Sequence, residues 1–164
     1  MNTHELHKRL ESIAAALLDQ ASALMGIADD LVKENADIDA LYLARAIQGE
    51  GAASFGDMRD QVGTLIGEVA VNRLETGWWG DSMVDIVTSA FHGYVNVEQP
   101  AAWAISLAQA AMHREEDHAQ GCLFVLSGGD LKKHGWNESD AVFSVEHDGF
   151  SLHFFREWPG KQSR

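Results

Sequence analysis

The sequence predicts an α+β fold that is mostly helical, with a small antiparallel β-sheet near the C-terminus and an extra helix at the N-terminus. Over the first two thirds of the chain, apolar residues recur at spacings of three and four, the period of an amphipathic helix. Beyond Gly121 they fall in short runs that are typical of strands. Asp148-Gly149 separates two such runs, which is a strong local signal for a two-residue β-hairpin.

Composition and charge limit the possible functions. With 164 residues, 46% of them hydrophobic and 23% charged, the chain resembles an ordinary soluble domain with one core. Its 25 acidic and 12 basic residues give a net charge of −13, so we expect no nucleic-acid partner. Cys122 is the only cysteine, which excludes an intrachain disulfide and a cysteine zinc site. His113 and His118 lack the spacing of four that places two zinc ligands on one helical face, so we expect no metal site there. The sequence also has no G-x-x-x-x-G-K-[ST] loop and no G-x-G-x-x-G motif, and we expect no organic cofactor.

The N-terminal segment, residues 1–36, is predicted to be an amphipathic helix, followed by a break at residues 35–37 and a domain over residues 37–164. Its apolar stripe has heptad-like spacing, with Gln20 in one position. The stripe fits a coiled coil or packing against the domain, and the sparse flanking charges favour packing or a tethering role. The stripe consists of Leu6, Leu10, Ile13, Leu17, Leu24, Ile27 and Leu31.

No membrane span is expected in this segment. Its longest apolar run, residues 13–18, is too short to cross a bilayer. The run also lacks the flanks of a secretory signal, so we expect synthesis in the cytoplasm without a visible signal peptide.

The domain is predicted to contain four helices before its strands. The first ends at Gly49-Glu50-Gly51, where two glycines permit a sharp turn. The second has the widest apolar face and is expected to lie at the centre of the core. The last begins near Pro100, a favoured first-turn residue. The four predicted ranges are residues 38–48, 59–75, 82–90 and 100–113.

The C-terminal hairpin is predicted to pair residues 142–147 with residues 150–155. A two-residue loop places one apolar set of side chains against the core and a polar set on the opposite face, where we expect a polar patch. The core set is Phe143, Val145, His147, Phe150, Leu152 and Phe154. The polar set is Ser144, Glu146, Ser151 and His153, with Val142 and Phe155 at the end.

Three positions could bind a ligand or act on it. Glu50, between glycines at a helix end, would suit a general acid if apolar walls disfavoured its charge, although spacing alone favours a solvated carboxylate. Asn72, late on the buried helix, fits an amide that orients a ligand or one satisfied by the backbone, and the second interpretation is the stronger. His153 beside Ser144 fits a substrate contact and a surface histidine equally well.

Five short motifs follow one another along the chain. Leu-Ala-Arg-Ala-Ile-Gln-Gly-Glu occupies residues 43–50, and Gly-Glu-Val-Ala-Val-Asn-Arg occupies residues 67–73. The others are Ala-Phe-His-Gly at residues 90–93, Gly-Cys-Leu-Phe at residues 121–124 and Leu-His-Phe-Phe at residues 152–155. Their order and spacing resemble the cell wall hydrolase family of the spore-cortex-lytic-enzyme type, over roughly residues 41–158.

The resemblance implies a lysozyme-like fold that cleaves the glycan strands of peptidoglycan. It implies that Glu50 is the catalytic acid, and that substrate is bound by Asn72, Phe91, His153 and Ser144. The chain departs from the family where Gly51 replaces the usual Ala and Phe155 the usual Tyr.

Two reaction types are compatible with this resemblance. A lytic transglycosylase needs only one carboxylate, whereas a hydrolytic muramidase needs a second carboxylate or a held water. Glu68, Asp57 and Glu146 are the possible second acids, and none is clearly placed, so we favour the transglycosylase. The alternative from another class is a non-catalytic structural or glycan-binding component of a phage particle or envelope assembly.

The substrate would lie outside the cytoplasm, although no export signal is visible. A phage-encoded endolysin, released by a holin or carried in a virion, would explain this, with the N-terminal helix as the attachment or self-association element. A truncated chain would explain the missing signal equally well.

Overall fold

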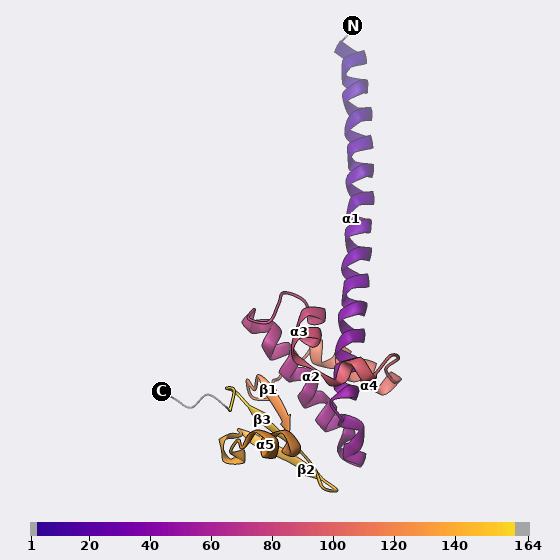
Figure 1. Cartoon of the computed structure of the whole chain (residues 1–164). Helices are drawn as coiled ribbons and strands as arrows, with labels where there is room; N and C mark the ends of the chain where they lie inside the picture. Colours follow the sequence, from indigo (N-terminus) through magenta and orange to yellow (C-terminus); the bar gives the residue numbers. More distant parts are fainter. Residues whose placement is uncertain (1–2, 160–164) are drawn as a thin grey trace. The chain divides into compact units, whose positions relative to one another are not determined.

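The computed structural model describes residues 3–159 and divides the chain into two compact units, Met1–Asp37 and Ile38–Arg164. The elements of the second unit confirm the predicted α+β class, with several helices followed by a three-stranded antiparallel sheet near the C-terminus (Figure 1).

The first unit is helical throughout its described length. Its residues belong to α1, which extends as one helix over Thr3–Gly49. The predicted break at residues 35–37 is therefore wrong. Asn and Asp have only modestly lower helix propensity than Ala, and without Gly or Pro at these positions nothing terminates the helix.

One stretch of this helix, His7–Ile27, is long and apolar enough to cross a membrane by length and composition, with a mean hydropathy of 1.3. Its side chains are exposed. The expectation that this segment does not span a membrane rests only on the shorter uninterrupted apolar run at residues 13–18. That expectation stays a prediction.

In the second unit, α2 (Arg59–Thr76) forms the centre of the core, as its wide apolar face predicts. It packs against three other helices, namely η1 (Ala52–Met58), α3 (Met83–Ala90) and α4 (Ala102–Met112). The predicted helices after residue 58 thus exist within two residues of their expected ends. A short 3-10 turn, η2 (Gly93–Asn96), connects α3 to α4.

The sheet has the order β1-β3-β2, with β1 at Phe124–Ser127, β2 at Phe143–His147 and β3 at Phe150–Phe155. The predicted hairpin register is confirmed, from His147 opposite Phe150 to Phe143 opposite Phe154. Asp148 and Gly149 both have positive φ, 47° and 83°, as a type I′ turn requires.

The two faces of the hairpin differ from the prediction in two respects. On the predicted core face, Phe150 is 54% exposed, at the turn end of the hairpin opposite His147. Val145, Leu152 and Phe154 enter the core as expected. The second face is not an open polar patch, since His153 and Phe155 are only 1% and 2% exposed. Two short helices, α5 (Gly128–His134) and η3 (Glu138–Asp140), lie between β1 and β2 in the sequence, and α5 packs beside β1 and β3 (Figure 1).

Candidate active site

Glu50 follows the last residue of α1, and its carboxylate is held by a distant part of the chain. Its Oε1 accepts a hydrogen bond from the backbone N–H of Gly93 at 2.8 Å. Gly49 and Gly93 pack backbone against backbone, so closely that a Cβ on either residue would overlap the carbonyl group of the other. The two glycines therefore allow the close approach that brings the Gly93 donor to the Glu50 side chain.

This contact predicts a large effect of one methyl group. Gly93→Ala is expected to push η2 away from the end of α1, to break the Glu50–Gly93 bond and to destabilise the fold by about 1–3 kcal/mol. Urea unfolding measures the loss. Gly26→Ala is the control, since a Cβ at Gly26 has nothing within 4 Å. Wild-type stability of Gly93→Ala would show that the close contact is unimportant.

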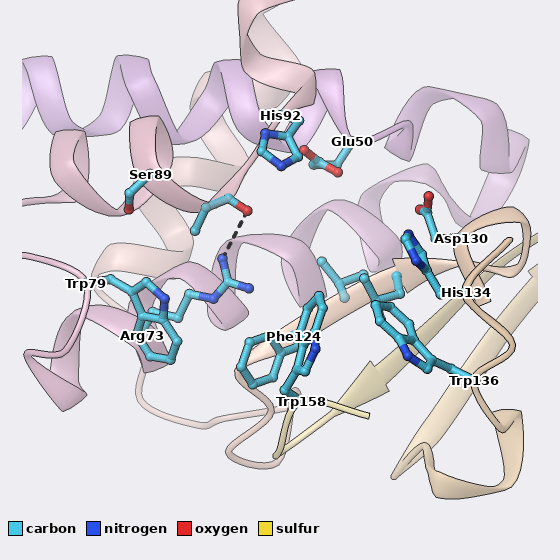
Figure 2. A pocket seen from close by; sticks show the side chains of 13 residues that line it. Glu50, Arg73, Trp79, Ser89, His92, Phe124, Asp130, His134, Trp136 and Trp158 are labelled. Carbon is cyan, nitrogen blue, oxygen red and sulfur yellow. Dashed lines mark hydrogen bonds between the residues drawn. The ribbon is translucent and has the colours of Figure 1, made fainter. Parts of the chain in front are cut away.

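Glu50 lines a cleft of about 360 Å³ (Figure 2). The remaining lining residues come from the end of α2, from the region of α3, from β1, from α5 and from the C-terminal segment. They are Arg73, Trp79, Ser89, Ala90, His92, Phe124, Val125, Leu126, Asp130, His134, Trp136 and Trp158. The cleft thus combines charged groups with many aromatic ones.

Arg73 is a buried cation of this cleft, with 5% of its surface exposed. Its Nε donates to the Leu123 carbonyl oxygen, and its Nη1 donates to that of Ala90 at 3.3 Å (Figure 2). The guanidinium carbon lies 4.8 Å from the ring centroid of Phe91 and 5.3 Å from that of Phe124. Burial lowers the pKa of Arg73 from 12.5 to about 10, while the negative charge of Glu50 acts to raise it. Arg73 is therefore positively charged at neutral pH.

A continuous run of aromatic rings forms one wall of the cleft. Successive ring centroids lie 5.8 Å apart between Trp79 and Phe124, 5.3 Å between Phe124 and Trp158, and 4.7 Å between Trp158 and Trp136. His134 stacks on Trp136 at 4.5 Å. Such a wall offers apolar ring faces to a ligand together with a few polar edges.

Two of the predicted substrate-binding residues lie outside this cleft, within the packed structure. Asn72 donates from Nδ2 to the Cys122 carbonyl oxygen at 3.1 Å and accepts at Oδ1 from Arg114 at 2.6 Å, so its amide joins α2 to the segment before β1. Phe91 is 2% exposed and packs under the guanidinium of Arg73. Its neighbour His92 lines the cleft in its place.

The other predicted pair, His153 and Ser144, lies in contact but away from this cleft, and His153 lines a second cavity of about 770 Å³. The Oγ of Ser144 is 2.7 Å from Nδ1 of His153, and the Oγ of Ser151 is 3.1 Å from its Nε2. Trp136 lines both cavities. The structure therefore brings these hairpin residues together without placing them in the cleft of Glu50.

Several cleft residues had no clear signal in the sequence. Arg73 adjoins the predicted Asn72, and Trp136 is a single aromatic residue outside any periodic pattern. Asp130 and His134 belong to a seven-residue helix that is too short to show a periodic pattern. Trp158 lies in the irregular segment after β3.

Glu68, one of the possible second acids, is a buried structural carboxylate. It is 1% exposed, accepts the backbone N–H of Ala119 at 2.7 Å and lies 2.8 Å from Nδ1 of His118. The hydrogen bond to Glu68 and its negative charge raise the pKa of His118 above 6.5. Glu68 therefore fastens the segment before β1 to α2.

The Glu68–His118 pair predicts a pH-dependent stability. Because the pKa of His118 is higher in the folded state, its stabilising contribution is complete below 6.5 and is lost as the pH rises through the folded-state value. The melting temperature of His118→Ala should therefore fall furthest below that of wild type at about pH 5.5, and the difference should shrink as the pH rises towards about 9. The exposed His113→Ala variant is the control, and a difference independent of pH would contradict the pairing.

No protein-family model, curated protein or solved structure matches this chain. Within residues 3–159, the structure also contains no cluster of three or more His, Cys, Asp or Glu side chains that could hold a metal ion.

Proposed function

We propose that the protein cleaves the glycan strands of peptidoglycan, with Glu50 as general acid and then general base. The observation that carries the proposal is a carboxylate held by the Gly93 N–H in a cleft that also contains a run of aromatic rings. In Figure 2 the Glu50 carboxylate lies at the upper side of the cleft, and the rings of Phe124 and Trp158 lie lower in the view. Sugar rings have apolar C–H faces that stack on such rings, and hydroxyl groups that suit the polar edges.

The resemblance to the cell wall hydrolase family supports the same residue for the acid. Glu50 ends the motif that is similar to the family's catalytic helix. The lysozyme-like fold that the resemblance implies remains part of this proposal. Phe124, His92 and Trp136 take the substrate-contacting roles here, since they line the cleft that Glu50 lines.

The favoured reaction needs one carboxylate. Protonated Glu50 gives its proton to the glycosidic oxygen, so that the bond to C1 of the muramoyl sugar breaks and the leaving sugar departs as an alcohol. The Glu50 carboxylate then takes the proton of the C6 hydroxyl, and O6 bonds to C1 to form a 1,6-anhydro product. The nearby positive charge of Arg73 stabilises the carboxylate that exists between the two proton transfers.

The competing hydrolase reaction requires a second carboxylate or a held water. Glu68 is bound to His118, Asp57 lies 3.7 Å from His147, and Glu146 lines the cavity of His153. Among the described residues, the other carboxylate that lines the cleft is Asp130. Its Oδ2 accepts from the Ser127 hydroxyl at 2.7 Å, at the start of α5, which gives it a capping role.

Asp130→Asn tests which reaction occurs. If Glu50 acts alone, the variant should release the same anhydro products as wild type, within about threefold in rate. A water-activating Asp130 would instead cause a loss of about 10²-fold or more. Mass spectrometry of fragments released from purified peptidoglycan measures both, because an anhydro fragment is lighter than a hydrolysed one by one water. Ser127→Ala, which removes only the partner of Asp130 at the cap, controls for loss of α5.

The same digest tests the proposal as a whole. Anhydro or reducing-end fragments from wild-type protein would support an enzyme, and their absence would favour the non-catalytic structural or glycan-binding alternative. Release by a holin, or carriage in a virion, remains part of the proposal for how the protein reaches its substrate.

A further inference from the structure

The helix of the first unit carries a broad apolar face along its own length. Over residues 10–27 its large apolar side chains are more than half exposed. Single exposed apolar residues are common on proteins, but a contiguous set along a helix marks a binding surface. The set consists of Leu10 at 57%, Ile13 at 56%, Leu17 at 59%, Leu18 at 70%, Leu24 at 67%, Met25 at 62% and Ile27 at 57%.

The spacing of these side chains indicates that the partner is a second helix. Five of them, with Gln20 completing the series, alternate steps of three and four, which averages 3.5 residues and is the period of a coiled-coil seam. Small residues flank the seam on both sides, which lets a second helix approach closely. These flanking residues are Ala14, Ala16, Ala21 and Ala23.

The polar side chains of the same stretch lie on the opposite side of the helix. At 3.6 residues per turn, Asp19 points about 180° away from Leu10, and Glu11, Ser12 and Ser22 lie between about 100° and 200° from it. A span of the bilayer would bury Asp19 near its middle, at a cost of about 2.5–3.5 kcal/mol. The charge distribution therefore favours a partner in water over a membrane.

We propose that this face binds the same face of a second copy of the chain, in a parallel coiled coil. A second copy supplies a helix with the same period and the same small flanking residues. In parallel register Gln20 lies opposite Gln20, where the two amides can hydrogen-bond to each other. In antiparallel register, centred on the same stretch, each Gln20 would face Leu17 and bury an amide without a partner.

Sedimentation velocity of the full chain tests the interaction. Wild-type protein should sediment as a dimer or larger assembly at about 10–100 μM, and Leu17→Glu should sediment as a monomer, since it places a charge in the seam while retaining high helix propensity. Ser22→Glu adds the same charge to the outer face and should leave the assembly intact. Circular dichroism confirms that both variants remain helical. A monomeric wild type, or equal effects of the two variants, would overturn the proposal.

Disulfide cross-linking tests the register. Oxidised Gln20→Cys should form a covalent dimer, whereas Ser22→Cys should not, because it lies on the outer face. Flotation with phosphatidylcholine vesicles distinguishes the membrane alternative. A chain that is monomeric in buffer and floats with vesicles would identify lipid as the occupant and overturn self-association, without affecting the assignment of Glu50.

Discussion

Glu50→Gln is expected to reduce glycan release by about 10²–10⁴-fold, the usual contribution of a positioned general acid. The amide keeps the shape of the side chain, and its oxygen can still accept the Gly93 N–H that Glu50 Oε1 accepts at 2.8 Å. What is lost is the transferable proton. The fold should therefore persist while the reaction stops.

The measurement is the rate of fragment release from purified peptidoglycan, beside the melting temperature of the same preparation. Glu98→Gln, at an exposed site outside the cleft, makes the same chemical change and should keep wild-type activity. Near-normal release by Glu50→Gln would remove this residue from the mechanism. Equal loss in both variants would point to an effect of charge alone.

Arg73→Met is expected to destabilise the fold by about 2–4 kcal/mol. Met fills most of the space of the Arg stem, but the carbonyl oxygens of Leu123 and Ala90 lose their donors. Each hydrogen bond from a charged donor contributes about 1.5–3 kcal/mol, and the aromatic contacts of the cation with Phe91 and Phe124 are lost as well.

Urea unfolding measures this loss. The matched control is Arg59→Met, which removes an arginine that is likewise stacked on an aromatic ring, at 4.8 Å from Trp103, but whose side chain is 39% exposed. Its cost should stay below about 1 kcal/mol, since exposed charges contribute little. If both substitutions cost the same, burial would not explain the role of Arg73.

Periodicity along the sequence predicted most of the second unit. The central helix at Arg59–Thr76 and the hairpin register around Asp148-Gly149 follow from local patterns of apolar residues and turn residues. The predicted break at residues 35–37 is absent from α1, because polar residues without Gly or Pro do not end a helix.

The cleft was less predictable, because its parts are distant in sequence. Glu50, the proposed acid, was favoured only by the family resemblance. Its partner Gly93 donates through the backbone N–H, and a backbone donor has no signal in the sequence. The small α5 covers the face of β3 that alternation alone would leave in water, which explains why His153 is buried. Alternation shows which side chains share a face but not what covers that face.

The contact between Gly49 and Gly93 also has a consequence for the timing of activity during synthesis. The donor that orients Glu50 lies 43 residues downstream of it, and the rings of Trp136 and Trp158 come later still. During synthesis on the ribosome, Glu50 is therefore added to the chain well before the residues that form the rest of the cleft. On the proposed function, an unfinished or clipped chain would be inert towards the wall, and lytic capacity would arise only when the last aromatic residue of the cleft has folded into place.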